Sequence, residues 1–200
     1  MAIECRAVCP EDLSDWLSFI EGGAFIDNPH WASCYCVFHY LADAADGPWA
    51  ERSGQVNREC LSTMVCEGRG RWILARDETR IVGWVNADLR PALRRYDEWG
   101  APTDATMGVV ACFVVDPVLR RQGIAGRLLE AACRDLAGRG AREIHAWVIQ
   151  DPAGAAASDT VGLGTDQMAH HGPLAMYLNA GFEVVDEADG LAHVRLAAGL

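Results

Sequence analysis

The chain has 200 residues, half of them hydrophobic, and a formal net charge of −11 at pH 7. Such a length and composition suffice for a packed core, so a largely disordered chain is excluded. The acidic balance argues against a general nucleic-acid binder, which needs basic surface to displace counterions from phosphates. A small anionic ligand held in one local basic pocket remains compatible with it.

The sequence also bears on compartment and domain organisation. No apolar run reaches the roughly 18 residues typical of a membrane helix, and residues 1–13 lack the layout of a signal peptide. We therefore expect a cytoplasmic protein without a membrane partner, in which the eight cysteines are mostly buried thiols rather than disulfides. Neither a repeat nor a linker divides the chain, so residues 1–200 are predicted to form a single domain.

Hydrophobic periodicity predicts alternating strands and helices. In chain order these are a strand at 2–9, a helix at 10–22, loops with a short helix at 23–50, a helix at 56–65, a hairpin at 71–89, an excursion at 90–107, a strand at 108–116, a helix at 123–138, a strand at 143–149, a Gly/Ala-rich interruption at 151–171, a short helix at 173–180 and a hairpin at 182–196. The strand at 108–116 is apolar on both faces, as is typical of a central strand. Three arginines of the excursion are expected to form a solvated loop face, namely Arg90, Arg94 and Arg95, with screening of an acidic ligand as the alternative.

Positive charge and small residues gather where the central strand gives way to a helix, in DPVLRRQGIAGRLL (residues 116–129). A helix N-terminus offers unpaired N–H groups and the positive end of the helix dipole, which suit a phosphate if side chains leave room. The small residues are Gly123, Ala125 and Gly126, and the countercharges are Arg120, Arg121 and Arg127. The sequence lacks both the nucleotide P-loop and the dinucleotide glycine pattern. A phosphate site is therefore predicted here, with a solvated basic turn as the alternative.

Two motifs carry a resemblance to a known family. The stretch VVDPVLRRQGIAGRLL has Arg120, Gly123 and Ala125 at the defining positions of Arg/Gln-x-x-Gly-x-Gly/Ala, and AMYLNAGFEVV places Tyr177 on a short helix before a Gly-Phe pair and a strand. In this order and spacing the chain resembles the GCN5-related N-acetyltransferase (GNAT) superfamily over about residues 3–196. The resemblance implies an α/β (α+β) fold, in which a mixed central sheet of about six to seven strands is flanked by about four helices and its central strands splay apart.

The same resemblance implies an enzyme that transfers an acetyl group from acetyl-CoA to an amine of a small molecule or peptide, by direct attack in a ternary complex and without a metal. The pyrophosphate would lie on the N–H groups of residues 122–126, and the pantetheine arm would pair with the backbone of the central strand. The donor-binding residues implied are Phe113, Val115, Arg120, Arg121, Gln122, Gly123, Ile124, Ala125, Gly126 and Arg127. The sequence does not name the acceptor amine, and it leaves formation of a homodimer open.

Tyr177 is the implied general acid, because a phenol of pKa about 10 can donate a proton to a departing thiolate. Packing of its ring in the core is the alternative. Many family members have asparagine and alanine seven and four residues before this tyrosine, where this chain has His170 and Pro173. His171 and His170 are candidate general bases, with Asp88 or a water relay as alternatives.

The stretch NPHWASCYCVFHY (residues 28–40) holds two histidines and two cysteines, the ligand types of zinc, but its Cys-x-Cys gap is not a usual zinc spacing. A buried aromatic cluster whose gaps are filled by cysteine is the second interpretation. The third, which the resemblance favours, is a wall of the acceptor site. The substrate-wall candidates are Trp31, Cys34, Tyr35, Cys36 and Asp88.

Two other classes of function compete with the enzyme. One is a non-catalytic module that binds or senses acyl-CoA. The other is a metal- or redox-responsive protein that uses Cys34 and Cys36. We expect no metal in that segment, and we expect Cys112 on the central strand to belong to the core.

Overall fold

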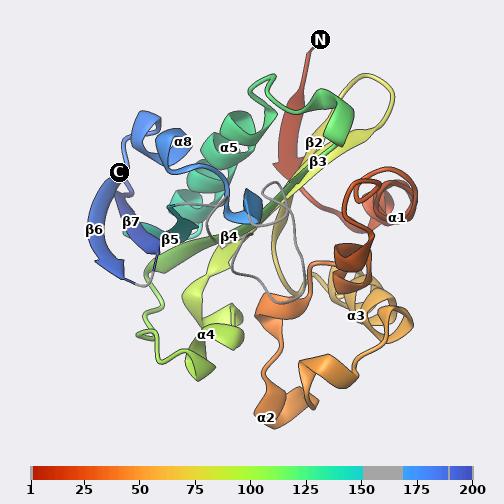
Figure 1. Cartoon of the computed structure of the whole chain (residues 1–200), viewed down its shortest axis with the longest axis horizontal. Coiled ribbons are helices and arrows are strands. Elements are labelled where there is room, and N and C mark those ends of the chain that lie inside the picture. Colours follow the sequence, from red (N-terminus) through yellow and green to blue (C-terminus); the bar gives the residue numbers. More distant parts are fainter. Residues whose placement is uncertain (1, 151–168, 189, 200) are drawn as a thin grey trace.

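Seven strands form one mixed sheet in the computed structural model, which describes residues 2–150, 169–188 and 190–199. The strands are β1 (Glu4–Ala7), β2 (Trp72–Arg76), β3 (Ile81–Leu89), β4 (Met107–Val115), β5 (Glu143–Ile149), β6 (Glu183–Ala188) and β7 (Leu191–Ala197). Their order across the sheet is β1-β2-β3-β4-β5-β7-β6 (Figure 1). All neighbours pair antiparallel except β4 and β5, which are parallel. The predicted fold class is confirmed.

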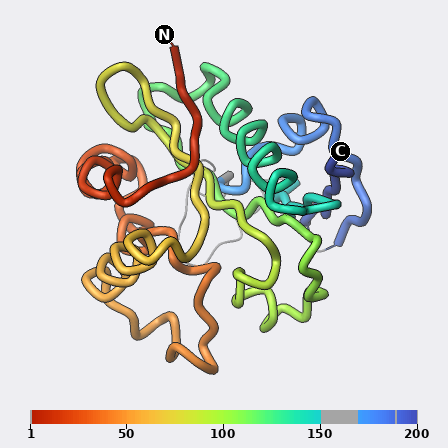
Figure 2. Tube along the Cα trace, turned by 180° about the vertical axis from the view of Figure 1, so that it is seen from behind, coloured from red at the N-terminus to blue at the C-terminus, as the bar shows by residue number. Residues whose placement is uncertain are grey.

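Helices cover both faces of this sheet. The described helices are α1 (Leu13–Gly22), α2 (Asp43–Asp46), α3 (Gly54–Cys66), α4 (Arg95–Glu98), α5 (Ile124–Gly138) and α8 (Leu174–Asn179). Short 3₁₀ turns are η1 (Pro10–Asp12), η2 (Pro29–Cys34), η3 (Phe38–Tyr40), η4 (Trp49–Glu51), η5 (Arg90–Ala92), η6 (Pro117–Leu119) and η7 (Ala169–His171). Figures 1 and 2 show α1 and α3 on one side of the sheet and α5 and α8 on the other.

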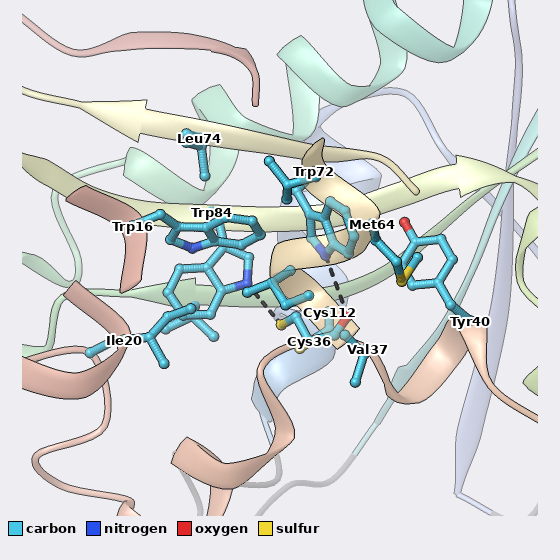
Figure 3. Close-up of a cluster of buried hydrophobic side chains, with 14 of the residues drawn as sticks. Trp16, Ile20, Cys36, Val37, Tyr40, Met64, Trp72, Leu74, Trp84 and Cys112 are labelled. Atoms are coloured by element: carbon cyan, nitrogen blue, oxygen red, sulfur yellow. Dashed lines mark hydrogen bonds between the residues drawn. The ribbon is translucent and has the colours of Figure 1, made fainter. Parts of the chain in front are cut away.

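The alternation of side chains along the strands divides the core into two layers. On β2, Trp72 and Leu74 pack toward α1 and α3, whereas Ile73 and Ala75 pack toward α5. The first layer is rich in tryptophan. Trp16 of α1 packs edge to face on Trp72, with 5.4 Å between the ring centroids (Figure 3). The periodicity therefore predicted most elements correctly, because the outer helices bury one face and the central strands β3 and β4 bury both.

The central strands part soon after they meet. Strands β4 and β5 pair at only three positions, the last of which is Val109 with His145. The turn η7 contacts both strands. Strand β4 also carries a bulge, since its pairing with β3 steps from Cys112 to Val110 and leaves Ala111 as the extra residue. The backbone of Ala111 hydrogen-bonds the His171 ring of η7. The expected splay of the central strands is thus confirmed.

The excursion after β3 differs from its prediction as a solvated loop face. Arg90 is fully buried and donates to the carbonyl oxygens of Leu93 (3.2 Å) and Ala101 (2.8 Å). Arg95 is 5% exposed, and its guanidinium lies 4.6 Å from the centre of the Phe38 ring. The prediction was wrong for both arginines, because carbonyls and acids of neighbouring loops replace their water, and Arg94 alone keeps a substantially exposed side chain.

No helix in the described part of the chain is long and apolar enough to cross a membrane.

Candidate active site

A cleft of about 690 Å³ opens beside the C-terminal half of β4. One wall is the end of β4 with the loop and first turn of α5, and the other comes from the segment that follows α1. Residues of η7 and α8 close the remaining side. The cleft therefore joins three segments that are far apart in sequence.

The edge of β4 is open along this cleft. The amide of Asp116 donates to the Val82 carbonyl on β3 at 2.9 Å. Because backbone groups alternate along a strand, the amides and carbonyls of Phe113 and Val115 face the other side. There β5 has already turned away, since its pairing with β4 ends at Val109. Phe113 and Val115 both line the cleft and offer backbone groups that another extended chain can use.

The loop after β4 ends in a cradle of backbone N–H groups. Gly123 is the N-cap of α5 and has a φ of +79°, a conformation that suits glycine. Within the described residues, the N–H groups of residues 123–126 have no hydrogen-bond acceptor. A Cβ added to Gly126 would meet nothing within 4 Å. This end of the cleft can therefore receive an anion directly against the start of the helix.

The predicted arginines of this loop take different positions. Arg120 is held by Asp27 of the opposite wall, with Nη1–Oδ2 and Nη2–Oδ1 distances of 2.5 and 3.2 Å. Its Nε also donates to the Val115 carbonyl at 3.3 Å. Arg121 lines the cleft and is exposed. Arg127 does not line the cleft, and its charge acts on Cys5 of β1.

Most of the predicted donor-binding residues thus come together. Those that line the cleft are Phe113, Val115, Arg120, Arg121, Gly123, Ile124, Ala125 and Gly126. Gln122 and Arg127 lie beside the cleft without lining it.

Tyr177 lies beneath the cleft rather than on its surface. The side chain is fully buried, and its hydroxyl donates to the His171 carbonyl at 2.8 Å. Its ring packs edge to face against Phe182 and Phe113. Burial raises the pKa of this phenol well above its ordinary value, so the hydroxyl keeps its proton at neutral pH.

The two candidate bases differ in access and in basicity. His170 lines the cleft, with its ring 4.2 Å from that of Trp31. Desolvation in the gap between β4 and β5 lowers the pKa of His171 to about 4, against the opposing effect of its hydrogen bond to Ala111. His171 is therefore neutral at pH 7 and a weak proton acceptor.

Asp88 lies apart from the cleft. Asp88 is 1% exposed, and its Oδ1 lies 2.8 Å from Nη2 of Arg139, which stands at the end of α5. Burial raises the pKa of Asp88, although Arg139 acts in the opposite direction. Asp88 therefore links β3 to the end of α5, and it does not line the cleft.

Among the other substrate-wall candidates, Trp31 lines the cleft, whereas Cys34, Tyr35 and Cys36 do not. The Tyr35 hydroxyl donates instead to Glu21 at 3.2 Å. Desolvation raises the pKa of Cys34 to about 12, so its thiol is protonated at neutral pH. In the part of the chain that the structure describes, no group of three or more His, Cys, Asp or Glu is placed to hold a metal.

Cys36 is the anchor of the aromatic segment (Figure 3). The Trp84 indole donates to its Sγ at 2.8 Å, and the Trp72 indole donates to its carbonyl at 3.3 Å. The Asn86 amide donates to the same carbonyl at 3.1 Å. Cys36 and Tyr35 have φ values of +52° and +46°, and these tertiary hydrogen bonds hold that uncommon backbone in place.

Sequence reasoning missed one polar residue of the cleft. Asn28 lines it, is 7% exposed, and has no hydrogen-bond partner for Oδ1 among the described residues. Its position at the start of the aromatic segment did not distinguish it from its neighbours.

Comparison with known proteins places this geometry in a family. Residues 34–157 match the model of the acetyltransferase (GNAT) family, which is more than half of the chain. The chain belongs to the GNAT family of acetyltransferases. No curated protein matches its sequence significantly.

Solved structures share the fold at low sequence identity. The PaiA N-acetyltransferase of Thermoplasma acidophilum, in complex with coenzyme A, is 15% identical with a TM-score of 0.55, over 98% of this chain and 99% of that chain. The GNAT domain of S. lividans PAT is 16% identical with a TM-score of 0.56, over 98% and 90%. An N-acetyltransferase of Staphylococcus aureus Mu50 is 14% identical with a TM-score of 0.53 over the whole of both chains. These likenesses extend the family assignment to the overall fold.

Proposed function

We propose that this GNAT protein is an acetyl-CoA-dependent N-acetyltransferase that acts on the amine of a small molecule or peptide. The transfer proceeds by direct attack of the amine in a ternary complex. One observation carries the proposal: the open edge of β4 and the N–H groups at the start of α5, which have no acceptor among the described residues, line the same cleft.

The residues of the cleft fit the donor from one end to the other. The N–H groups of residues 123–126 would hold the pyrophosphate, where Gly126 leaves room for it. Arg121 lines the cleft and would add countercharge, whereas Arg120 of the same loop is engaged by Asp27. By resemblance to the family, Gln122, Ile124 and Arg127 belong to the same donor-binding loop, although Gln122 and Arg127 do not line the cleft. The backbone groups of Phe113 and Val115 would pair with the pantetheine arm.

Acetyl-CoA supplies the acetyl group as a thioester, and the chain must manage the protons of the reaction. We assign Tyr177 the role of general acid toward the leaving thiolate. Its raised pKa keeps the phenol protonated, as a donor must be. To donate, the hydroxyl must turn away from the His171 carbonyl that it now meets at 2.8 Å.

The amine must lose a proton before or during its attack. His170 is the better-placed candidate base because it lines the cleft, whereas the lowered pKa of His171 makes that ring a weak base. A water relay without a dedicated base is the alternative.

A panel of amines tests the proposal directly. Primary amines, amino acids and lysine peptides are incubated with the purified protein and acetyl-CoA, and the released thiol is measured. The proposal predicts protein-dependent thiol release with at least one amine, and an N-acetylated product of the expected mass. Thiol release without an acetylated amine would instead indicate hydrolysis.

One observation favours a second candidate, a module that binds acyl-CoA without catalysis. The Tyr177 hydroxyl is fully buried and already bonded to the backbone, which is also the arrangement of a purely structural tyrosine. This candidate predicts tight acetyl-CoA binding together with no acetylation of any amine in the panel.

A further inference from the structure

The side-chain amide of Asn28 is unlike those of the other buried asparagines in the described part of the chain. Asn57 is 1% exposed, but its Oδ1 accepts from Arg52 at 2.8 Å and its Nδ2 donates to the Ser33 carbonyl at 2.9 Å. Asn86 likewise uses both ends of its amide. Asn28 is 7% exposed, and its Oδ1 has no partner in the described residues. An unpaired buried acceptor costs stability, and of the described side chains that hold such an atom only Asn28 lines the cleft, so an occupant of the cleft can supply the partner once the amide turns.

Neighbouring contacts fix where Asn28 lies along the cleft. The preceding residue, Asp27, pairs with Arg120, whose Nε is bound to the Val115 carbonyl. The amide of Trp31 donates to the Asn28 carbonyl at 3.1 Å, and the Trp31 ring meets that of His170. Asn28 therefore lies on the wall opposite β4, between the basic loop and the aromatic end of the cleft.

We propose that Asn28 binds an amide group of the pantetheine arm. This inference rests on the proposed function, because it takes acetyl-CoA as the occupant of the cleft. The stretch between the phosphates and the thioester is the part of that molecule that carries amides. A half-turn about the Cβ–Cγ bond exchanges Oδ1 and Nδ2, so the asparagine can accept from an N–H of the arm or donate to its carbonyl. The arm is then held from both walls, by the β4 backbone and by Asn28.

Calorimetry with two ligands tests this role. Coenzyme A carries the arm, and 3′-phosphoadenosine diphosphate is the same nucleotide without it. Asn28→Ala should bind coenzyme A about three- to tenfold more weakly, the effect of one neutral hydrogen bond. Its affinity for the nucleotide should equal that of the wild type.

Two further variants separate binding from folding. Asn28→Leu removes the unpaired acceptor and should melt no lower than the wild type without ligand, yet bind coenzyme A as weakly as Asn28→Ala. Asn57→Ala breaks a satisfied buried amide, so it should melt lower while keeping wild-type affinity for coenzyme A. A residue with a purely structural role would not give this combination of effects.

The inference is overturned if Asn28→Ala binds coenzyme A as the wild type does, or if it loses the same factor for the armless nucleotide. A loss confined to the KM of the acceptor amine would also overturn it, and would assign Asn28 to the acceptor. If the wild type binds neither ligand, the proposed function fails first and takes this inference with it.

Discussion

The hydroxyl of Tyr177 separates the enzyme from the binding module. Its ring is fixed by Phe113 and Phe182, and the hydroxyl contributes one hydrogen bond to the His171 carbonyl. As a proton donor in catalysis or as a structural hydrogen bond to η7, that hydroxyl would have effects of different size. A neutral hydrogen bond contributes about 1 kcal/mol to folding, whereas general-acid catalysis contributes a factor of roughly 10²–10⁴ in rate.

Tyr177→Phe should therefore lower kcat by about 10²–10⁴ with a small loss of stability. The loss should appear equally in kcat and kcat/KM, because the proton moves only in the transition state. Steady-state kinetics with the best amine of the panel measures this. Turnover at the wild-type rate, with a slightly lower melting temperature, would reduce Tyr177 to a support for η7.

Arg121 tests the electrostatic part of the donor site. Its exposed side chain lines the cleft next to the N–H cradle, so it acts on phosphate through solvent-screened attraction. Arg121→Ala should weaken acetyl-CoA binding about two- to fivefold, the scale of an exposed ion pair. Binding should also become less sensitive to salt. An unchanged salt dependence would place the phosphates elsewhere.

At the scale of elements, the loop after β4 was predictable because its chemistry is local. A strand end, two glycines and a helix start suffice to predict unpaired N–H groups near residues 123–126. Which neighbouring side chains line the cleft is not local. Gln122 and Arg127 belong to the same motif, yet neither faces the cleft, since the loop conformation decides their direction.

The segment at 28–40 shows the limit of local patterns more clearly. Cys36 is fixed by Trp72, Trp84 and Asn86, which lie on two strands much later in the chain. Such contacts leave no periodic trace near the cysteines. The same holds for Asn28, which lines the cleft only because the tertiary fold brings the segment after α1 opposite β4.

The anchoring of that segment leads to a prediction for its cysteines. A Cys34→Ser, Cys36→Ser protein should fold and bind acetyl-CoA, because neither thiol lines the cleft and serine can accept from the Trp84 indole. A loss of about 1 kcal/mol in stability is expected for the poorer fit. Elemental mass spectrometry should find no stoichiometric zinc in the wild type. A tightly bound metal whose chelation unfolds the protein would overturn this account of the segment.

At the scale of the whole molecule, buried and half-buried histidines couple folding to pH. Desolvation lowers the pKa of His39 to about 3 and that of His171 to about 4, and it also lowers the pKa values of His145 and His193. Between these values and the ordinary pKa of about 6.5, the unfolded chain binds protons that the folded chain does not. Stability should therefore rise as pH increases from about 4 to 6.5.

His39→Phe isolates one contribution, because this ring is 6% exposed and packs among aromatic side chains. The variant should be nearly as stable as the wild type at pH 7. Its stability should fall less steeply below pH 6.5, by up to about 1.4 kcal/mol per pH unit. Urea unfolding at several pH values measures both slopes. Equal slopes of unfolding free energy against pH in the wild type and the variant would mean that the pKa of His39 is the same in the folded and the unfolded protein.

The central claim is that the start of α5 holds the phosphates of acetyl-CoA, and calorimetric titration of matched glycine variants tests it most directly. Gly123 and Gly140 stand at opposite ends of α5 with φ values of +79° and +95°, and a Cβ at either would meet nothing within 4 Å. Glutamate at either position therefore carries a similar backbone cost. The account predicts that the wild type and Gly140→Glu bind acetyl-CoA with equal affinity, and that Gly123→Glu shows no binding. Wild-type affinity in Gly123→Glu would contradict it.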